Sequence, residues 1–155
     1  MDNNDILRKI RYTFDLGDDK MIEIFGLAEL EVTRSQVSDW LKKEDDPTFK
    51  GIIDYELATF LNGFIIHRRG KKDGPQAVAE KRTNNNIVFR KLKIALNLKD
   101  EDILEIFKLV DMRISKHELS SFFRKPTQDK YRPCKDQFLR NFLHGMQLKY
   151  HIEKK

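Results

Sequence analysis

Cys134 and His144 come closest to a catalytic pair in this chain. A cysteine thiolate with a histidine base supports acyl transfer only when a third group orients the imidazole and an oxyanion site accepts the developing charge. Cys134 follows Pro133 in a predicted loop, and His144 is ten residues further on. Nothing in the sequence supplies the other two parts, and it has neither a Gly-rich phosphate loop nor a nucleophile motif. We therefore expect no enzyme and no catalytic residues.

The acidic and histidine residues form no metal-binding pattern. The single cysteine and the four histidines lack the spacing of a structural zinc site. The run EDD at 44–46 lacks the spacing and the distal glutamate of a calcium loop. Asp18 and Asp100 stand where helices are expected to begin, and the helix dipole accounts for acids there. We expect no metal and no cofactor.

The basic side chains are distributed unevenly. Residues 1–66 carry 8 Lys/Arg against 14 Asp/Glu, residues 67–83 carry 6 against 2, and residues 84–155 carry 16 against 9. The corresponding net charges are about −6, +4 and +7. Phosphate neutralisation by the basic part would favour DNA or RNA as a partner. Attraction between the acidic and basic parts, within one chain or between chains, explains the same partition, so a protein partner or a homo-oligomer stays open.

An internal repeat determines the elements that position these residues. Shifting the sequence by 82 positions aligns residues 3–68 with 85–150 without a gap, and about a quarter of the positions are identical. Asp18/Asp100, Phe25/Phe107, Phe60/Phe142 and Gly63/Gly145 are among the shared pairs. The sequence therefore contains one unit twice.

Apolar periodicity predicts four helices in each unit. In the first, Asn4 or Asn86 can cap a segment with an apolar residue at every fourth position. The second begins at Asp18 or Asp100 and is expected to stop near Glu29 or Asp111. The fourth starts near residues 54 and 136, and we infer that another helix passes too close to its glycine, Gly63 or Gly145, for a side chain.

The third helix of each unit has the clearest start. Thr33 with Gln36, and Ser115 with Glu118, both match the capping box, in which each side chain accepts a backbone N–H of the other residue. The buried side is expected to be formed by Val37, Trp40 and Leu41, and by Leu119, Phe122 and Phe123 in the second unit.

The predicted fold is all-α, with two tandem four-helix lobes. We expect the first helical repeat at 1–69, a basic linker at 70–83 and the second repeat at 84–155. Lobes this small bury little surface alone, so they should dock on each other. The sequence has no apolar run of about eighteen residues and no signal segment. With only one cysteine, a soluble cytoplasmic protein fits best.

The second and third predicted helices of each lobe are similar to a helix-turn-helix, whose second helix reads the DNA major groove. The turn has no glycine, and Glu31 and Asp39 would repel phosphate, so the alternative is a plain surface helix. The outward face would present Arg34, Ser35, Ser38, Asp39 and Lys42 in the first lobe. In the second it would present Lys116, His117, Ser120, Ser121 and Arg124, followed by Lys125.

The bases of the linker and of the first helices are two further candidate groups, and each also has a structural alternative. The linker group Arg68, Arg69, Lys71 and Lys72, with Lys81 and Arg82, suits DNA, RNA or an acidic protein, and its alternative is a solvated hinge. The first-helix bases around Arg8 and Arg90 would extend a phosphate-binding surface. Their favoured role is an ion pair with Glu23 or Glu105 on the next helix.

With these residues in view, the chain resembles the YehS-like family of small bacterial proteins, which have a duplicated domain of unknown function. The matching stretches include NNDILRKIRYTFDLGDDKMIEIF, VTRSQVSDWLKKEDDP, ELATFLNGFI, RGKKDGP, ALNLKDEDILEIF, SKHELSSFFRKP and CKDQFLRNFL. The resemblance implies a bacterial cytoplasmic protein with an internal duplication. It implies no activity. The sequence therefore favours a non-enzymatic binding protein that associates with nucleic acid through its basic second half, or else a protein-binding or self-associating module.

Overall fold

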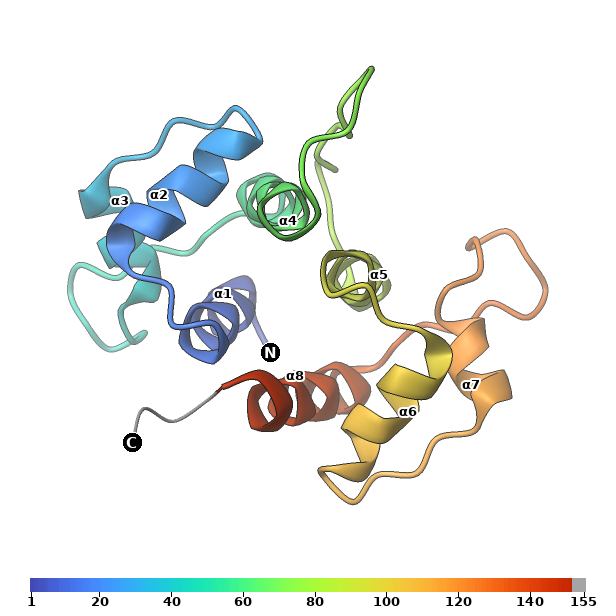
Figure 1. Cartoon of the computed structure of the whole chain (residues 1–155). Coiled ribbons are helices and arrows are strands. Elements are labelled where there is room, and N and C mark those ends of the chain that lie inside the picture. The colour runs from blue at the N-terminus through green and yellow to red at the C-terminus, as the bar shows by residue number, and fades with distance from the viewer. Residues whose placement is uncertain (152–155) are drawn as a thin grey trace.

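A computed structural model of the chain describes residues 1–151, which form helices and no strands (Figure 1). The helices are α1 (Asn3–Thr13), α2 (Asp18–Leu27), α3 (Arg34–Leu41), α4 (Asp54–Arg69), α5 (Asn85–Ala95), α6 (Asp100–Lys108), α7 (Lys116–Ser121) and α8 (Asp136–Tyr150). Each helix of the first four has a counterpart that begins 82 positions later. The all-α class and the tandem repeat are thus confirmed. Among residues 1–151, no helix is both long and apolar enough to cross a bilayer.

The second helix of each repeat ends earlier than its apolar pattern predicts. α2 ends at Leu27 and α6 at Lys108, and the predicted last residues, Glu29 (φ 66°) and Asp111 (φ 56°), adopt the left-handed conformation instead. The N–H of Leu30 then donates to the Phe25 carbonyl at 3.1 Å, and the N–H of Glu29 donates to Gly26 at 2.9 Å. This is the Schellman pattern, which satisfies carbonyl groups at a helix end.

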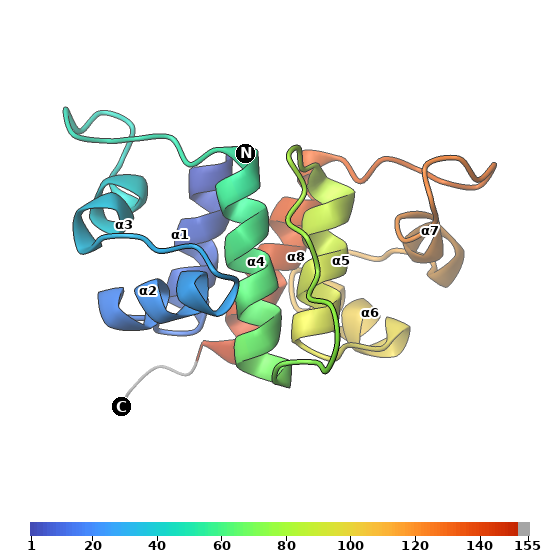
Figure 2. The same ribbon diagram turned by 90° about the horizontal axis from the view of Figure 1, so that it is seen from above.

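Four helices form the centre of the molecule: α1 and α4 from the first repeat, α5 and α8 from the second. α4 packs on α5 and α1 packs on α8, while α2 with α3 and α6 with α7 lie on opposite outer sides (Figure 1). All four central helices begin at one edge of the molecule and end at the other (Figure 2). Buried side chains of both repeats belong to a single hydrophobic cluster. The predicted docking of the two lobes is therefore confirmed.

The two repeated glycines lie where helices cross. A Cβ on Gly63 would be 1.9 Å from the carbonyl oxygen of Ile24 on α2, and a Cβ on Gly145 would be 2.4 Å from that of Ile106 on α6. Contacts this short are not tolerated between a side chain and a backbone carbonyl. The close approach inferred from the sequence is confirmed in both repeats.

Two aspartates at the beginnings of α4 and α8 hold the residues that precede α5 and α1. Asp54 accepts hydrogen bonds from the Asn3 side chain (2.8 Å) and from the Thr83 N–H (3.1 Å). Asp136 accepts the equivalent bonds from Asn85 (2.7 Å) and the Met1 amino group (3.2 Å).

Opposite charge contributes little to this docking. In the described chain, the Met1–Asp136 contact is the one ion pair that joins residues 1–69 to residues 84–151. Direct ion pairs between the two halves therefore contribute little to their docking within one chain.

Candidate nucleic-acid interface

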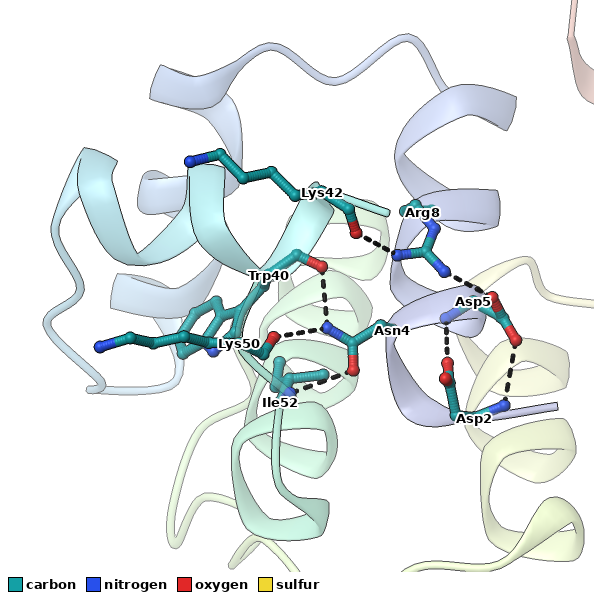
Figure 3. Close-up of polar contacts among 8 residues, drawn as sticks. All are labelled: Asp2, Asn4, Asp5, Arg8, Trp40, Lys42, Lys50 and Ile52. Carbon is teal, nitrogen blue, oxygen red and sulfur yellow. Dashed lines mark hydrogen bonds and ion pairs between the residues drawn. The ribbon is translucent and has the colours of Figure 1, made fainter. Parts of the chain in front are cut away.

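A buried asparagine fixes the loop that follows the third helix of the first repeat. The Asn4 amide donates to the carbonyls of Trp40 (2.8 Å) and Lys50 (2.9 Å), and its oxygen accepts the Ile52 N–H at 3.1 Å (Figure 3). The prediction that Asn4 caps α1 was wrong. Asp2 is the cap, because its carboxylate accepts the Asp5 N–H while Asp5 accepts that of Asp2.

Asn86 fixes the equivalent loop of the second repeat in the way that Asn4 fixes that of the first. Its amide donates to Phe122 (3.0 Å) and Arg132 (2.9 Å), and its oxygen accepts the Cys134 N–H at 2.8 Å. Asn84, not Asn86, caps α5. The two ends of the loop between α7 and α8 are thus tied to one buried side chain, and the residues between them project from the bundle (Figure 1).

The third helices begin where predicted, but only the first has both halves of the capping box, and Leu41 and Phe123 on the predicted buried sides are half-buried. Thr33 and Gln36 form the complete capping box, and Ser115 accepts the Glu118 N–H at 3.0 Å. Trp40 and Phe122 are buried. The connections from the second helices span residues 28–33 and 109–115, longer than the three- or four-residue turn of a helix-turn-helix. The assignment to that motif therefore stays a prediction.

The third helix of the second repeat is shorter than predicted. α7 ends at Ser121, which is buried, and its hydroxyl donates to the Glu118 carbonyl. Arg124 and Lys125 therefore lie in the following loop and not on the face of a helix, and the prediction of a continuous basic helix face was wrong. Phe122 is the C-cap residue, and the rings of Phe122 and Phe123 pack against Phe89 beyond the end of the helix.

In the first repeat the candidate cations are already paired with acids. Arg34 lies 3.5 Å from Asp18 and also forms an ion pair with Asp19, and these contacts raise its pKa, the Asp19 hydrogen bond most of all. Lys42 is 3.0 Å from Asp39. Ser35 is exposed and Ser38 half-buried. This face therefore offers little free positive charge.

The first turn of α7 repeats that pairing. Lys116 forms an ion pair with Glu101 at 3.1 Å, and that hydrogen bond raises the pKa of Lys116. His117 is exposed and Ser120 half-buried. α3 and α7 also lie at opposite ends of the molecule (Figure 2), so the structure does not join their candidate residues into one surface.

More than half of the unpaired Lys/Arg of residues 84–151 lie in the loop of residues 122–135, here called the basic loop. It holds five Lys/Arg and one acid, Asp129, whereas the equivalent residues 40–53 hold three lysines and three acids. Within the described chain, none of the five cations forms an ion pair. They are Arg124, Lys125, Lys130, Arg132 and Lys135. Lys130, Arg132 and Lys135 were not among the site residues predicted from the sequence, although a count of charges over the loop would have found them.

The linker is held against the bundle. Glu80 lies 3.0 Å from the buried ammonium of Lys91 and 3.7 Å from Arg90. Arg68 stacks over the Phe14 ring, and Arg69 donates to the Ile94 carbonyl at 3.2 Å. Lys71 and Lys72 are exposed. Two of the four candidate linker residues are therefore engaged in packing, and the lysines remain exposed.

Two further predictions concern the acids of the second helices and the single cysteine. The proposed pairing of Glu23 and Glu105 with first-helix bases was wrong, because both acids are exposed and pair along their own helices with Lys20 (2.6 Å) and Lys108 (3.0 Å). Cys134 is buried, and burial raises the pKa of its thiol to about 12. The thiol therefore stays protonated near neutral pH and is a poor nucleophile.

Comparison with known proteins identifies the family. The model of a family described as "Protein of unknown function (DUF1456)" matches residues 3–70 and again residues 85–151. The chain is 41% identical to the "Uncharacterized protein YehS" of Escherichia coli (strain K12) over 153 residues, 98% of each chain. No solved structure matches. The two matches coincide with the two structural repeats, and the chain belongs to this family of duplicated, YehS-like proteins of unknown function.

Proposed function

We propose that the protein binds nucleic acid without catalysis, through contacts of the basic loop with the phosphate backbone. The observation that carries the proposal is the set of five unpaired Lys/Arg side chains on residues 122–135. Lysines and arginines that neutralise phosphates supply the sequence-independent part of nucleic-acid affinity. His117 and Ser120 on α7, with the linker residues Lys71 and Lys72, are proposed to extend the contact.

The attachment of the loop supports this proposal. Asn86 holds the carbonyls of Phe122 and Arg132, so the loop base is fixed before a ligand arrives. Within the loop, the Gln128 N–H donates to Lys125 at 2.9 Å and the Tyr131 N–H donates to Gln128 at 3.0 Å. A preordered loop loses less conformational entropy on binding than a flexible one. A cytoplasmic location, where nucleic acid is abundant, is part of the proposal.

The test is fluorescence anisotropy at low salt with duplex DNA, structured RNA and a single strand. Binding in the micromolar range is expected for at least one probe, weakening as salt rises. The variant Lys125→Glu/Arg132→Glu should bind at least tenfold more weakly, and its log–log salt slope should fall by roughly 2, since each duplex phosphate contact contributes about 0.9.

The repeat provides a matched control. Lys43 and Lys50 occupy the positions equivalent to Lys125 and Arg132, 82 residues earlier, and all four are exposed. The variant Lys43→Glu/Lys50→Glu changes the net charge by nearly the same amount and should keep most of the affinity. Equal losses in both variants, or no binding by the unmodified protein, would overturn the proposal.

A second candidate function is self-association. Residues 1–66 carry 8 Lys/Arg against 14 Asp/Glu, and the basic loop lies at the far end of the second repeat (Figure 2), so the basic end of one copy can meet the acidic repeat of the next. Sedimentation velocity at low salt should then show oligomers that dissociate as salt rises. A monomer across the concentration range would remove this candidate and leave the first intact.

A further inference from the structure

The two repeats pack against each other along two equivalent seams, and the linker covers only one of them. The first seam lies between α4 and α5, and residues 70–83 run along it (Figure 2). The second lies between α1 and α8. Because α1 corresponds to α5 and α8 to α4, the two seams are built from equivalent positions of the repeat.

The covered seam shows what its surface binds. The linker crosses it as an extended chain, and the Glu80 carboxylate contacts both Lys91 (3.0 Å) and Arg90 (3.7 Å). Lys91 also donates to the Asn62 side chain and is only 6% exposed. A carboxylate on an extended peptide therefore satisfies a cation pair on the first helix of the repeat.

Among the described residues, the uncovered seam presents the same cation pair with no carboxylate at the place of Glu80, and Arg8 pairs instead with Asp5 of its own helix. Arg8 and Lys9 stand at the positions of Arg90 and Lys91, and with Arg140 they line a groove of about 510 Å³. The Lys9 ammonium donates to a neutral partner, Gln147, at 2.9 Å. Arg140 is exposed and has no ion pair within the described chain.

We propose that this α1/α8 groove binds an extended segment of a partner protein that carries a glutamate or aspartate. The acid pairs with Lys9 and Arg140, as Glu80 pairs with Lys91 and Arg90. It also pairs with Arg8 once that side chain has released its present partner, Asp5. The apolar part of the segment lies on Tyr12, which lines the same groove and is 47% exposed.

A peptide fits the groove better than a nucleic acid does. Asp5 lines it, and Asp136 stands at the edge where α1 and α8 begin, so a continuous phosphate backbone would meet two carboxylates. A peptide can place a single acid against the cations and neutral residues beside the acids.

The linker itself supplies a probe for this groove. A fluorescein-labelled peptide of residues 74–83, GPQAVAEKRT, is titrated with the full-length protein at low salt. We expect saturable binding, and a peptide with the Glu80→Gln change should bind about fivefold more weakly, since a partly exposed ion pair contributes up to about that factor. The protein variant Lys9→Gln should show a similar loss.

Two control variants identify the site. Lys91→Gln, checked by circular dichroism for intact helices, tests whether the peptide merely displaces the linker from its own seam. Lys125→Glu/Arg132→Glu removes the proposed nucleic-acid contact and should leave peptide binding unchanged, so the two proposals fail separately. Absence of binding, binding indifferent to the glutamate, or a loss in Lys91→Gln alone would overturn the groove proposal. Weakened nucleic-acid binding in Lys9→Gln together with unchanged peptide binding would assign the groove to nucleic acid instead.

Discussion

At the residue scale, Asn4 and Asn86 hold the fold of each repeat together more than any charged residue does. Each is buried and satisfies two carbonyls and one N–H of the loop after the third helix. Buried backbone groups left without a partner cost about 1–3 kcal/mol each. Asn86→Ala should therefore lower the free energy of unfolding by about 2–4 kcal/mol, measured by urea denaturation.

A half-buried asparagine of the second repeat provides the comparison for Asn86. Asn141 lies on α8, and in the described chain its side chain makes no hydrogen bond. Asn141→Ala should change stability by less than about 0.5 kcal/mol. If the two variants unfold at the same urea concentration, the role given to Asn86 is wrong.

Two glycine-to-alanine substitutions should change the stability of the protein in opposite directions. Gly63→Ala places a Cβ against the Ile24 carbonyl and should destabilise the protein by about 1–3 kcal/mol, because α2 must move away from α4. Gly26 lies inside α2 with nothing within 4 Å of its Cβ position, so Gly26→Ala should stabilise by up to about 1 kcal/mol. Thermal unfolding of both variants measures the difference, and two shifts of the same sign would contradict it.

Single residues also show where sequence interpretation succeeds and where it stops. The close approach at Gly63 was predictable because a glycine inside an apolar helix costs stability unless something needs the space. The partners of Asn4 were not, because they are backbone groups 36 to 48 residues away, and a backbone group leaves no trace in the sequence. The sequence predicts a cap at Asn4 because capping is the commonest role of an asparagine at a helix start.

At the element scale, the joined beginnings of the central helices make stability depend on pH. The hydrogen bond from Asn3 is the main cause that lowers the pKa of Asp54, and the bond from Asn85 does the same for Asp136. A carboxyl whose pKa is lower in the folded state stabilises the fold above about pH 4, and this contribution is lost as the pH falls through the folded-state pKa.

The variant Asp54→Asn tests this, because asparagine keeps an acceptor but does not titrate in this range. The fall in the urea midpoint between pH 6 and pH 3 should be smaller in this variant than in the unmodified protein. Expressed as free energy of unfolding, the loss between pH 6 and pH 3 should differ between the two proteins by less than about 1 kcal/mol, because Asp54 is partly exposed to solvent. Asp129→Asn, in the basic loop, removes an exposed acid that makes no ion pair in the described chain, and it should leave the pH dependence unchanged.

The elements themselves were largely predictable, but the surface that they present was not. Apolar spacing and the capping residues Thr33 and Ser115 located the third helices correctly. The length of α7 was overestimated because Phe122 and Phe123 continue its apolar pattern after the helix has ended. As a result, the cations of residues 122–135 are predicted partly on a helix face and partly in an unassigned loop.

At the scale of the whole molecule, the question is whether the two repeats fold as one unit. Their buried side chains form one cluster, and each repeat contributes two helices to the centre. A repeat of this size buries only about 60% of the surface of its unfolded chain and would be marginally stable alone. The pairing of α1 with α8 and of α4 with α5 left no sign in the sequence, because apolar stripes identify a buried face but not its partner.

The single tryptophan makes that unity measurable. Trp40 lies buried in the first repeat, 5.4 Å from the Phe25 ring centroid, so its fluorescence reports on that repeat, whereas circular dichroism reports on the helices of both. The two signals should change together in urea, as expected of a cooperative two-state transition.

The stricter test is Gly145→Ala, which strains only the crossing of α8 with α6 in the second repeat. Because the core is shared, this variant should lower the Trp40 fluorescence midpoint as much as the dichroism midpoint. If the fluorescence midpoint stays where it is in the unmodified protein, the repeats unfold independently, and the α1/α8 and α4/α5 seams are weaker than their packing indicates.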